Sequence, residues 1–197
     1  MHHDILYVMA LPQEGMGLLE NLGIDVLYTG VGKVNATYAL TKELATRRAL
    51  KRLPRRVINL GTAGSRVFKT GALVACNQFV QRDMDVSPLG FEHGETPFEE
   101  GPIVLECPPA FLEMDHGICG SGDSFVTGEL PVPCDIMEME GYALAKVCLR
   151  ENIPFAAVKY ITDGADENAA MDWPERLRHA AESFAEFVET MQENIAA

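Results

Sequence analysis

Continuous apolar runs alternate along this chain with stretches in which apolar residues recur every three or four positions. The runs, rich in Val, Ile and aromatic residues, predict buried strands, whereas the wider spacing predicts helices that bury one face. The strands are expected at residues 5–11, 25–29, 57–60, 72–80, 117–121, 124–127 and 154–161, and a short apolar run at 134–137 leads into a helix.

The predicted helices lie between these strands. Pro12 is expected in the first turn of a helix, and Pro174 is expected to begin the last one, because proline is tolerated at the start of a helix. A glycine turn at Gly30 and Gly32 precedes a third helix. The three- and four-residue spacing predicts which face of each helix is buried. For the helix after Gly32 this face consists of Val34, Tyr38, Thr41 and Ala45, and for the helix after residues 134–137 of Ala143, Val147 and Arg150. For the last helix it consists of Leu177, Ala181, Phe184, Val188, Met191 and Ile195.

Strands that alternate with helices predict an α/β fold in three layers, α/β/α, with a mixed central sheet covered on both faces. The 197 residues suit a single domain, because domains average about 150 residues. Residues 82–109 contain many Pro, Gly and acidic residues and little periodicity, so we expect loop and edge structure there. We therefore treat residues 1–197 as one domain.

The amino-acid composition limits which binding partners and which cellular location we expect for this protein. The chain has 16 Lys and Arg against 29 Asp and Glu, a formal net charge of −13, and this charge repels nucleic acid and anionic lipid. No run approaches the roughly 18 apolar residues of a membrane span, and the N-terminus does not resemble a secretory signal. Five scattered cysteines indicate reduced thiols rather than disulfides or a zinc site. We expect a cytoplasmic protein.

Acidic residues follow several predicted strands. Ligands of open α/β sheets bind at the carboxyl ends of strands, so Glu14, Glu138, Glu140 and Asp163 are candidate site residues. Each also has an ordinary structural explanation: a carboxylate in a first helical turn or an Asp at a turn stabilises the backbone locally. Position alone leaves both interpretations open.

Other chemistries receive little support. The turn at Gly30 and Gly32 lacks the third glycine of a dinucleotide fingerprint, and residues 117–122 do not form a serine nucleophile elbow. His93, His116 and His179 lack metal-ligand spacing. The glycines at 61 and 64 fit either a tight turn or a close approach of the backbone to a ligand.

Seven segments in the same order resemble the nucleoside phosphorylase superfamily, and within it the bacterial 5′-methylthioadenosine/S-adenosylhomocysteine nucleosidases. They lie at residues 10–14, 29–34, 59–64, 83–86, 121–126, 137–140 and 161–166. The most specific are Met-Glu-Met-Glu at 137–140 and Ile-Thr-Asp-Gly-Ala-Asp at 161–166. The chain is shorter than typical members, and Lys159 replaces their usual Arg.

The resemblance implies a catalytic arrangement for breaking the bond between adenine and ribose. Asp163 would protonate N7 of the departing base, because a free purine anion is a poor leaving group. Glu14 would activate water, with Thr62 helping to hold it. Glu140 would accept hydrogen bonds from the ribose hydroxyls and favour the cationic sugar of the transition state. Neither metal nor cofactor is implied.

The same resemblance assigns the substrate-binding residues. Phe125 would stack on the base, the backbone of Val126 would read its edge, and Met139 would pack beneath the sugar. Glu138 is a further substrate-binding residue in this assignment. The 5′ thioalkyl group would lie against Leu11 and Val31 and, from a neighbouring subunit, against Val86 and Leu89. The resemblance therefore implies a homodimer whose partner completes the 5′ pocket.

Water is the expected nucleophile. Phosphorylases of the superfamily hold phosphate with an Arg just before the glycine turn, whereas this chain has Ile58, Asn59 and Leu60 there. Glu14 would also repel a phosphate dianion. The alternatives are a nucleosidase or phosphorylase for another purine nucleoside, and a non-catalytic nucleoside-binding protein.

Overall fold

The structure is a computed structural model that describes residues 5–126, 128–164 and 169–196, the last range with its side chains over 176–193. Strands and helices alternate along the chain, as the apolar pattern predicts. The elements are β1 (Ile5–Met9), α1 (Pro12–Gly15), α2 (Leu18–Asn21), β2 (Val26–Tyr28), α3 (Lys33–Ala49), β3 (Arg56–Ser65), β4 (Leu73–Gln81), the 3₁₀ turn η2 (Ser87–Leu89), β5 (Val104–Glu106), β6 (His116–Ser121), β7 (Ile136–Glu138), α4 (Gly141–Glu151), β8 (Phe155–Asp163) and α5 (Ala169–Ala196).

The described strands form one mixed sheet in the order β2-β1-β3-β7-β6-β4-β5, and β8 pairs with both β3 and β4. The strand β3 runs parallel to β1 and β8 and antiparallel to β7. Residues 73–76 of β4 pair with β8, and β6 pairs with Ala75 and with residues 78–81. Because β3 and β4 are connected on one side through β8 and on the other through β7 and β6, these five strands close into a ring.

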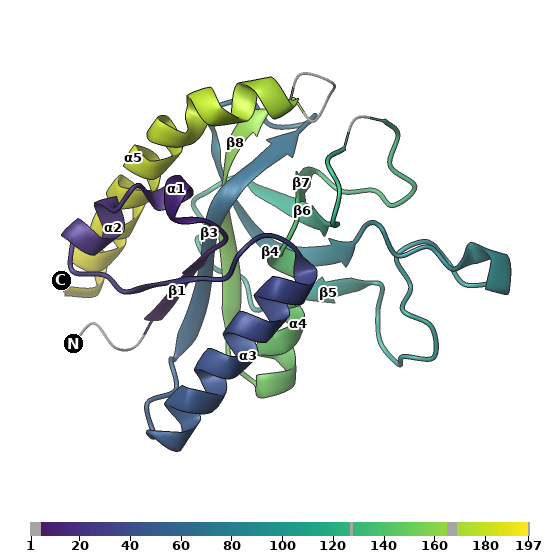
Figure 1. The fold of residues 1–197 in the computed structure, drawn as a ribbon, viewed down its shortest axis with the longest axis horizontal. Coiled ribbons are helices and arrows are strands. Elements are labelled where there is room, and N and C mark those ends of the chain that lie inside the picture. Colours follow the sequence, from purple (N-terminus) through teal and green to yellow (C-terminus); the bar gives the residue numbers. More distant parts are fainter. Residues whose placement is uncertain (1–4, 127, 165–168, 197) are drawn as a thin grey trace.

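Helices cover both faces of the sheet, which confirms the predicted three-layer α/β/α arrangement (Figure 1). On one face, Leu40 and Leu44 of α3 and Leu144 of α4 join a buried cluster with the sheet. On the other face, Leu19 of α2 and Phe184 of α5 pack on Ile58 and Leu60 of β3 and on Val158 and Tyr160 of β8. The strands β3 and β8 are thus buried from both sides, and their carboxyl ends open between the layers.

The predicted buried face of α3 is wrong. Val34 and Tyr38 are 79% and 67% exposed, whereas Ala36, Leu40 and Leu44 are buried. Both sets recur at four-residue spacing, so periodicity alone does not choose between them. The direction in which the chain leaves Gly32 places the second set against the sheet. For α5 the prediction is confirmed at Ala181, Phe184 and Val188, which are buried.

Three predicted boundaries also change. The glycines at 61 and 64 lie inside β3 rather than in a turn, because β8 and β7 pair with this strand as far as Ser65. The expected strand at 124–127 is absent over residues 124–126, which have no strand partner, and Thr127 lies outside the described residues. The last helix begins at Ala169, five residues before Pro174, so this proline does not mark its first turn.

Candidate active site

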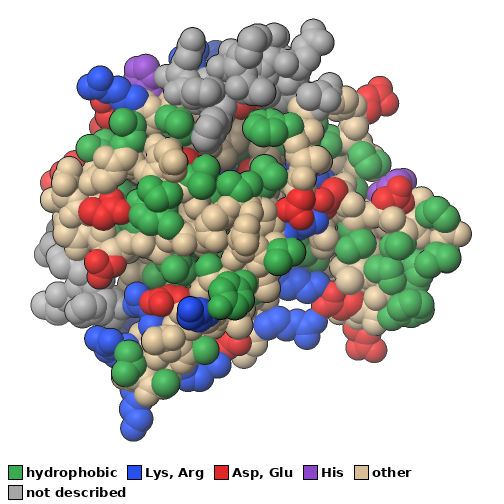
Figure 2. Space-filling view, in the orientation of Figure 1, with side chains coloured by type: hydrophobic (Ala, Val, Ile, Leu, Met, Phe, Trp, Pro, Cys, Tyr) green, Lys and Arg blue, Asp and Glu red, His purple; other side chains and the backbone are tan. Residues whose placement is uncertain are grey.

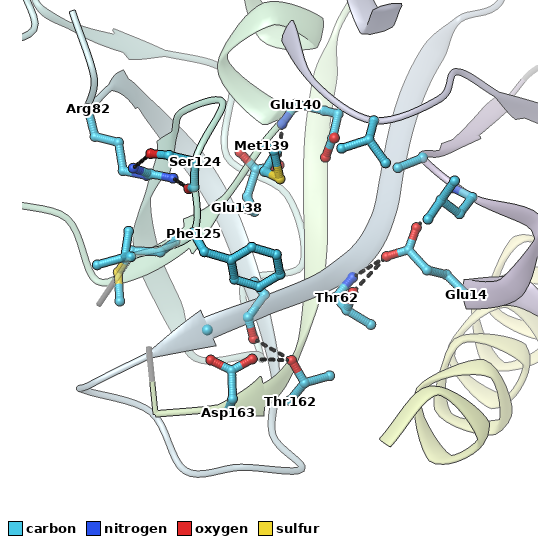
Figure 3. Close-up of a pocket in the computed structure, with 17 residues that line it drawn as sticks. Glu14, Thr62, Arg82, Ser124, Phe125, Glu138, Met139, Glu140, Thr162 and Asp163 are labelled. Atoms are coloured by element: carbon cyan, nitrogen blue, oxygen red, sulfur yellow. Dashed lines mark hydrogen bonds between the residues drawn. The ribbon is translucent and has the colours of Figure 1, made fainter. Parts of the chain in front are cut away.

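The carboxyl ends of β3, β7 and β8 border a cavity of about 210 Å³, which α1 and the segment after β6 complete. Figure 3 shows Glu14, Glu140 and Asp163 around it, with Phe125 in the same space. Ten of the twelve residues singled out from the sequence line this cavity. They are Leu11, Glu14, Val31, Thr62, Phe125, Val126, Glu138, Met139, Glu140 and Asp163.

Glu14 is held by hydrogen bonds at both carboxylate oxygens. Its Oε1 accepts from the backbone N of Thr62 at 2.8 Å and from the Thr62 hydroxyl at 2.7 Å, and its Oε2 accepts from the backbone N of Leu11 at 3.1 Å. The side chain is only 4% exposed. Both sequence interpretations therefore hold, because Glu14 caps the first turn of α1 and also lines the cavity.

Glu14 and Lys159 both lie close to Gly61 of β3. A Cβ added there would lie 3.6 Å from Oε1 of Glu14 and 3.4 Å from Nζ of Lys159, which is ordinary contact. The φ of Gly61 is not in the left-handed region, so no turn requires a glycine here. Only a side chain larger than that of alanine would compete with the two charged groups for space.

Glu138 and Lys159 form a buried ion pair beneath the cavity. Nζ of Lys159 lies 2.9 Å from Oε2 of Glu138 and donates at 2.6 Å to Oδ1 of Asn59. Glu138 also accepts from the Ser121 hydroxyl and from the backbone N of Glu140 and Gly141. Burial favours a neutral carboxyl, but the charge of Lys159 and these hydrogen bonds hold the pKa of Glu138 below its usual range.

Glu140, two residues further on, has the opposite electrostatic environment. Burial and the neighbouring Glu138 charge raise its pKa to about 8. Its Oε1 accepts from the backbone N of Gly32, just before α3, at 2.7 Å. Two nearby carboxyl groups thus differ in ionisation because only Glu138 has a direct cationic partner among the described residues.

Asp163 ends β8 on the floor of the same cavity. It is 5% exposed, and the Thr162 hydroxyl lies 2.7 Å from its Oδ2. In register, Asp163 pairs with Gly64 of β3, and β3 also carries Thr62. The parallel pairing of β3 and β8 therefore brings Asp163 and the Glu14–Thr62 pair to one end of the sheet. Asp166, part of the same sequence segment, lies outside the described residues.

The other end of the cavity is more apolar. Phe125 is 60% exposed, Val126 is buried against Met137, and Met139 lines the same cavity. An apolar pocket with a few polar groups suits a flat heteroaromatic ligand. Figure 3 places Arg82 beside Ser124, the residue before Phe125.

The two residues assigned to a neighbouring subunit's pocket lie outside this cavity, and the structure adds other residues to its lining. Val86 and Leu89 do not line the cavity of their own chain, and Leu89 is 72% exposed on η2. Sequence reasoning missed Arg82, Ser124 and Met137. Arg82 directly precedes the segment at 83–86 that was singled out, but its role depends on how β4 pairs with β6.

Within the described part of the chain, no helix is long and apolar enough to cross a membrane. Over those same residues, no group of three or more His, Cys, Asp or Glu side chains is arranged to hold a metal ion.

Comparison with known proteins gives consistent matches. The model of the phosphorylase superfamily matches residues 16–193. The chain is 31% identical over 192 residues to the 5′-methylthioadenosine/S-adenosylhomocysteine nucleosidase of Haemophilus influenzae strain 86-028NP, covering 87% of this chain and 81% of that protein. It is 30% identical over 197 residues to the nucleosidase of the same name from Geobacillus thermodenitrificans, covering 89% and 81%.

Solved structures agree with these matches. A mutant of the corresponding Helicobacter pylori enzyme, with 5′-methylthioadenosine in its active site, has a TM-score of 0.83 and 26% identity, covering 98% of this chain and 100% of that one. The futalosine hydrolase of Helicobacter pylori also has a TM-score of 0.83 and 26% identity, covering 96% and 97%. The predicted nucleoside phosphorylase-like fold is confirmed.

Proposed function

This chain belongs to the phosphorylase superfamily, and we propose that it is a purine nucleosidase that hydrolyses the N-glycosidic bond of 5′-methylthioadenosine, S-adenosylhomocysteine or both, releasing adenine. The observation that carries the proposal is the convergence of Glu14, Glu140 and Asp163, from three different elements, on one cavity. A binding protein for a neutral nucleoside has no evident need for three buried acids.

Each acid has a separate proposed role. Asp163 donates a proton to N7 of adenine as the glycosidic bond breaks, which avoids release of a purine anion. Glu14 takes a proton from the attacking water, and its two bonds to Thr62 hold its carboxylate toward the sugar. Glu140 binds the ribose hydroxyls, and its anionic form stabilises the oxocarbenium-like sugar.

The apolar groups define where the rest of the substrate lies. Phe125 stacks on the base, and the buried Val126 offers its backbone to the purine edge. Met139 packs beneath the sugar, and Leu11 and Val31 contact the 5′ substituent. Glu138 lies beneath the sugar site. It accepts a hydrogen bond from the backbone N of Glu140 at 3.0 Å and so orients that residue.

Water is favoured over phosphate as the nucleophile. Four carboxyl groups line the cavity, those of Glu14, Glu138, Glu140 and Asp163. Of the cations close to it, Lys159 is bonded to Glu138 and Asn59, and Arg82 is bonded to the segment around Ser124. A phosphate dianion would therefore meet negative charge without an available positive partner among the described residues.

Incubation with 5′-methylthioadenosine in phosphate-free buffer tests the proposal directly. We expect stoichiometric adenine and 5-methylthioribose, detected by chromatography. Asp163→Asn should bind the nucleoside with similar affinity but turn it over about 10²- to 10⁴-fold more slowly, because general acid catalysis acts in the transition state. Absence of adenine from this and every other purine nucleoside would refute the proposal, and a wild-type protein that binds without turnover would indicate a binding protein.

A second candidate substrate is another 5′-modified purine nucleoside. The similar futalosine hydrolase structure favours this possibility, and Val31, at the proposed 5′ end, is 40% exposed. A substrate panel with different 5′ groups, with and without phosphate, distinguishes these activities. Ribose 1-phosphate derivatives formed only with phosphate would instead identify a phosphorylase.

The proposal includes a homodimer whose partner completes the 5′ pocket. Residues 83–103, the arm, extend away from the sheet (Figure 1) and carry Leu89 and Phe98, which are 72% and 92% exposed. Figure 2 shows hydrophobic side chains gathered over this arm. Val86 and Leu89 are proposed to reach the neighbouring subunit's cavity. Leu89→Asp should give a monomer in analytical ultracentrifugation and a higher KM, and an unaltered dimer with unaltered KM would contradict this arrangement.

Residues 1–197 are proposed to act as one domain in the cytoplasm. Strands from β1 to β8 share one sheet, which supports the single domain. All five cysteines are free thiols, and four are buried. Such thiols suit a reducing compartment.

A further inference from the structure

The segment that would contact the base, residues 122–126, is poorly fixed by packing. Its described residues belong to no helix or strand. Phe125 is 60% exposed, and Val126 is the one member with a buried side chain. Val126 packs with Met137 at one end of the segment, but apolar packing does not account for the position of residues 122–125 or of the aromatic ring.

Arg82, the first residue after β4, supplies hydrogen bonds to this segment. Its Nη2 donates to the carbonyl of Gly122 at 3.1 Å and to the carbonyl of Ser124, and its Nη1 lies 3.4 Å from the Ser124 hydroxyl. Arg82 is 6% exposed, and within the described chain its guanidinium bonds only to this segment, with Nε buried and unpartnered. The planar guanidinium of arginine can donate hydrogen bonds to two carbonyl groups in a fixed geometry, and the single ammonium group of lysine cannot reproduce this arrangement.

A glycine directly after the neighbouring strand makes room for this guanidinium. A Cβ added at Gly122 would lie 2.8 Å from Cζ and from Nη1 of Arg82, closer than real side chains approach. The pairing of β4 with β6 fixes the position of Arg82, and the hydrogen bonds of its guanidinium in turn hold residues 122–126.

Asp83 holds the same segment from its other side. Its Oδ2 accepts from the backbone N of Asp123 at 2.9 Å, and its Oδ1 accepts from Nζ of Lys33 at 2.5 Å. Asp123 in turn accepts from the backbone N of Lys33 at 2.9 Å. The segment is thereby tied to the first residue of α3, which follows Gly32, the residue bonded to Glu140.

We propose that Arg82 and Asp83 are positioning residues for base recognition: together they hold residues 122–126 so that Phe125 and the Val126 backbone meet the purine. This inference rests on the proposed function for the identity of the ligand. Neither residue needs to touch the reacting atoms. Their loss should therefore weaken binding of the base while leaving the sugar end of the cavity unchanged.

Binding of the two separate products tests the inference. The variants are Arg82→Met, Arg82→Lys and Asp83→Asn, with Arg48→Met as the control, because Arg48 pairs with Glu151 on the surface between α3 and α4. Isothermal titration measures affinity for adenine and for 5-methylthioribose separately. For Arg82→Met we expect adenine affinity to fall about tenfold or more, because hydrogen bonds from a charged donor are lost. Affinity for 5-methylthioribose should stay within about twofold.

Hydrogen–deuterium exchange of the unliganded protein provides a second measurement. The Asp123 amide should exchange faster in Arg82→Met and Asp83→Asn than in the wild type or Arg48→Met. Arg82→Lys should recover only part of the adenine affinity. If Arg82→Met does not fold, Asp83→Asn, which changes a part-exposed side chain, is the deciding variant.

Unchanged adenine affinity in a folded variant would overturn the inference, as would an equal loss of affinity for both products. If the wild type binds no adenine, the proposed function fails, and the exchange rate of the Asp123 amide still decides whether Arg82 and Asp83 hold the segment. Unchanged exchange in that case overturns this inference as well.

Discussion

Replacing Glu140 with Gln should stabilise the free protein increasingly as the pH rises. Burial and the charge of Glu138 raise the pKa of Glu140 from 4.5 to about 8, opposed by Lys159 and by the hydrogen bond from Gly32. In the unfolded chain the group ionises near 4.5, so between that pH and 8 the folded state binds the extra proton. Stability therefore falls as the pH rises through this window and levels off above it.

The size of the effect follows from the two pKa values. At about 1.4 kcal/mol per pH unit, the raised pKa of Glu140 lowers the free energy of unfolding by about 2 kcal/mol at pH 6, where only the unfolded state is ionised, and by about 5 kcal/mol at pH 9. The Gln side chain has no such cost and can still accept from Gly32. The stability difference between variant and wild type should thus grow by about 2 to 3 kcal/mol over this range.

Urea unfolding followed by circular dichroism at pH 6, 7.5 and 9 measures this difference. Glu151→Gln, which removes a surface carboxylate paired with Arg48, is the matched control and should show no comparable pH trend. A difference between Glu140→Gln and wild type that stays constant from pH 6 to pH 9 would refute the assignment of Glu140 as a destabilising buried acid. The gain in stability should accompany a loss of activity, because Gln cannot supply the negative charge.

Three further outcomes are expected. The wild-type kcat/KM should rise with pH toward a plateau above about 8, as free Glu140 ionises, and Glu140→Gln should lack this rise. Lys159→Met should lower the unfolding free energy by about 3 to 5 kcal/mol in urea, because it leaves Glu138 charged and buried without its partner; an unchanged midpoint would show that the pair is unimportant. Glu14→Gln should lower kcat by about 10²-fold or more without changing adenine affinity, measured by steady-state kinetics and titration.

The sequence by itself predicted most of the elements and the candidate site residues. The apolar run at residues 154–161 is typical of a strand buried on both faces, so β8 was predictable. Acidic residues after such strands, together with the resemblance carried by the segments at 137–140 and 161–166, singled out Glu140 and Asp163, and the structure brings both to one cavity. These features are local, and local sequence specifies them.

Only the tertiary structure decided which faces and partners these elements use. The two four-residue patterns in α3 are equivalent until packing buries Leu40 rather than Tyr38. Likewise, Gly61 lies within a strand because β3 is paired as far as Ser65, and Arg82 reaches Ser124 because β4 lies beside β6. Each outcome depends on contacts between residues far apart in the chain, and no local pattern of apolar and polar positions encodes those contacts.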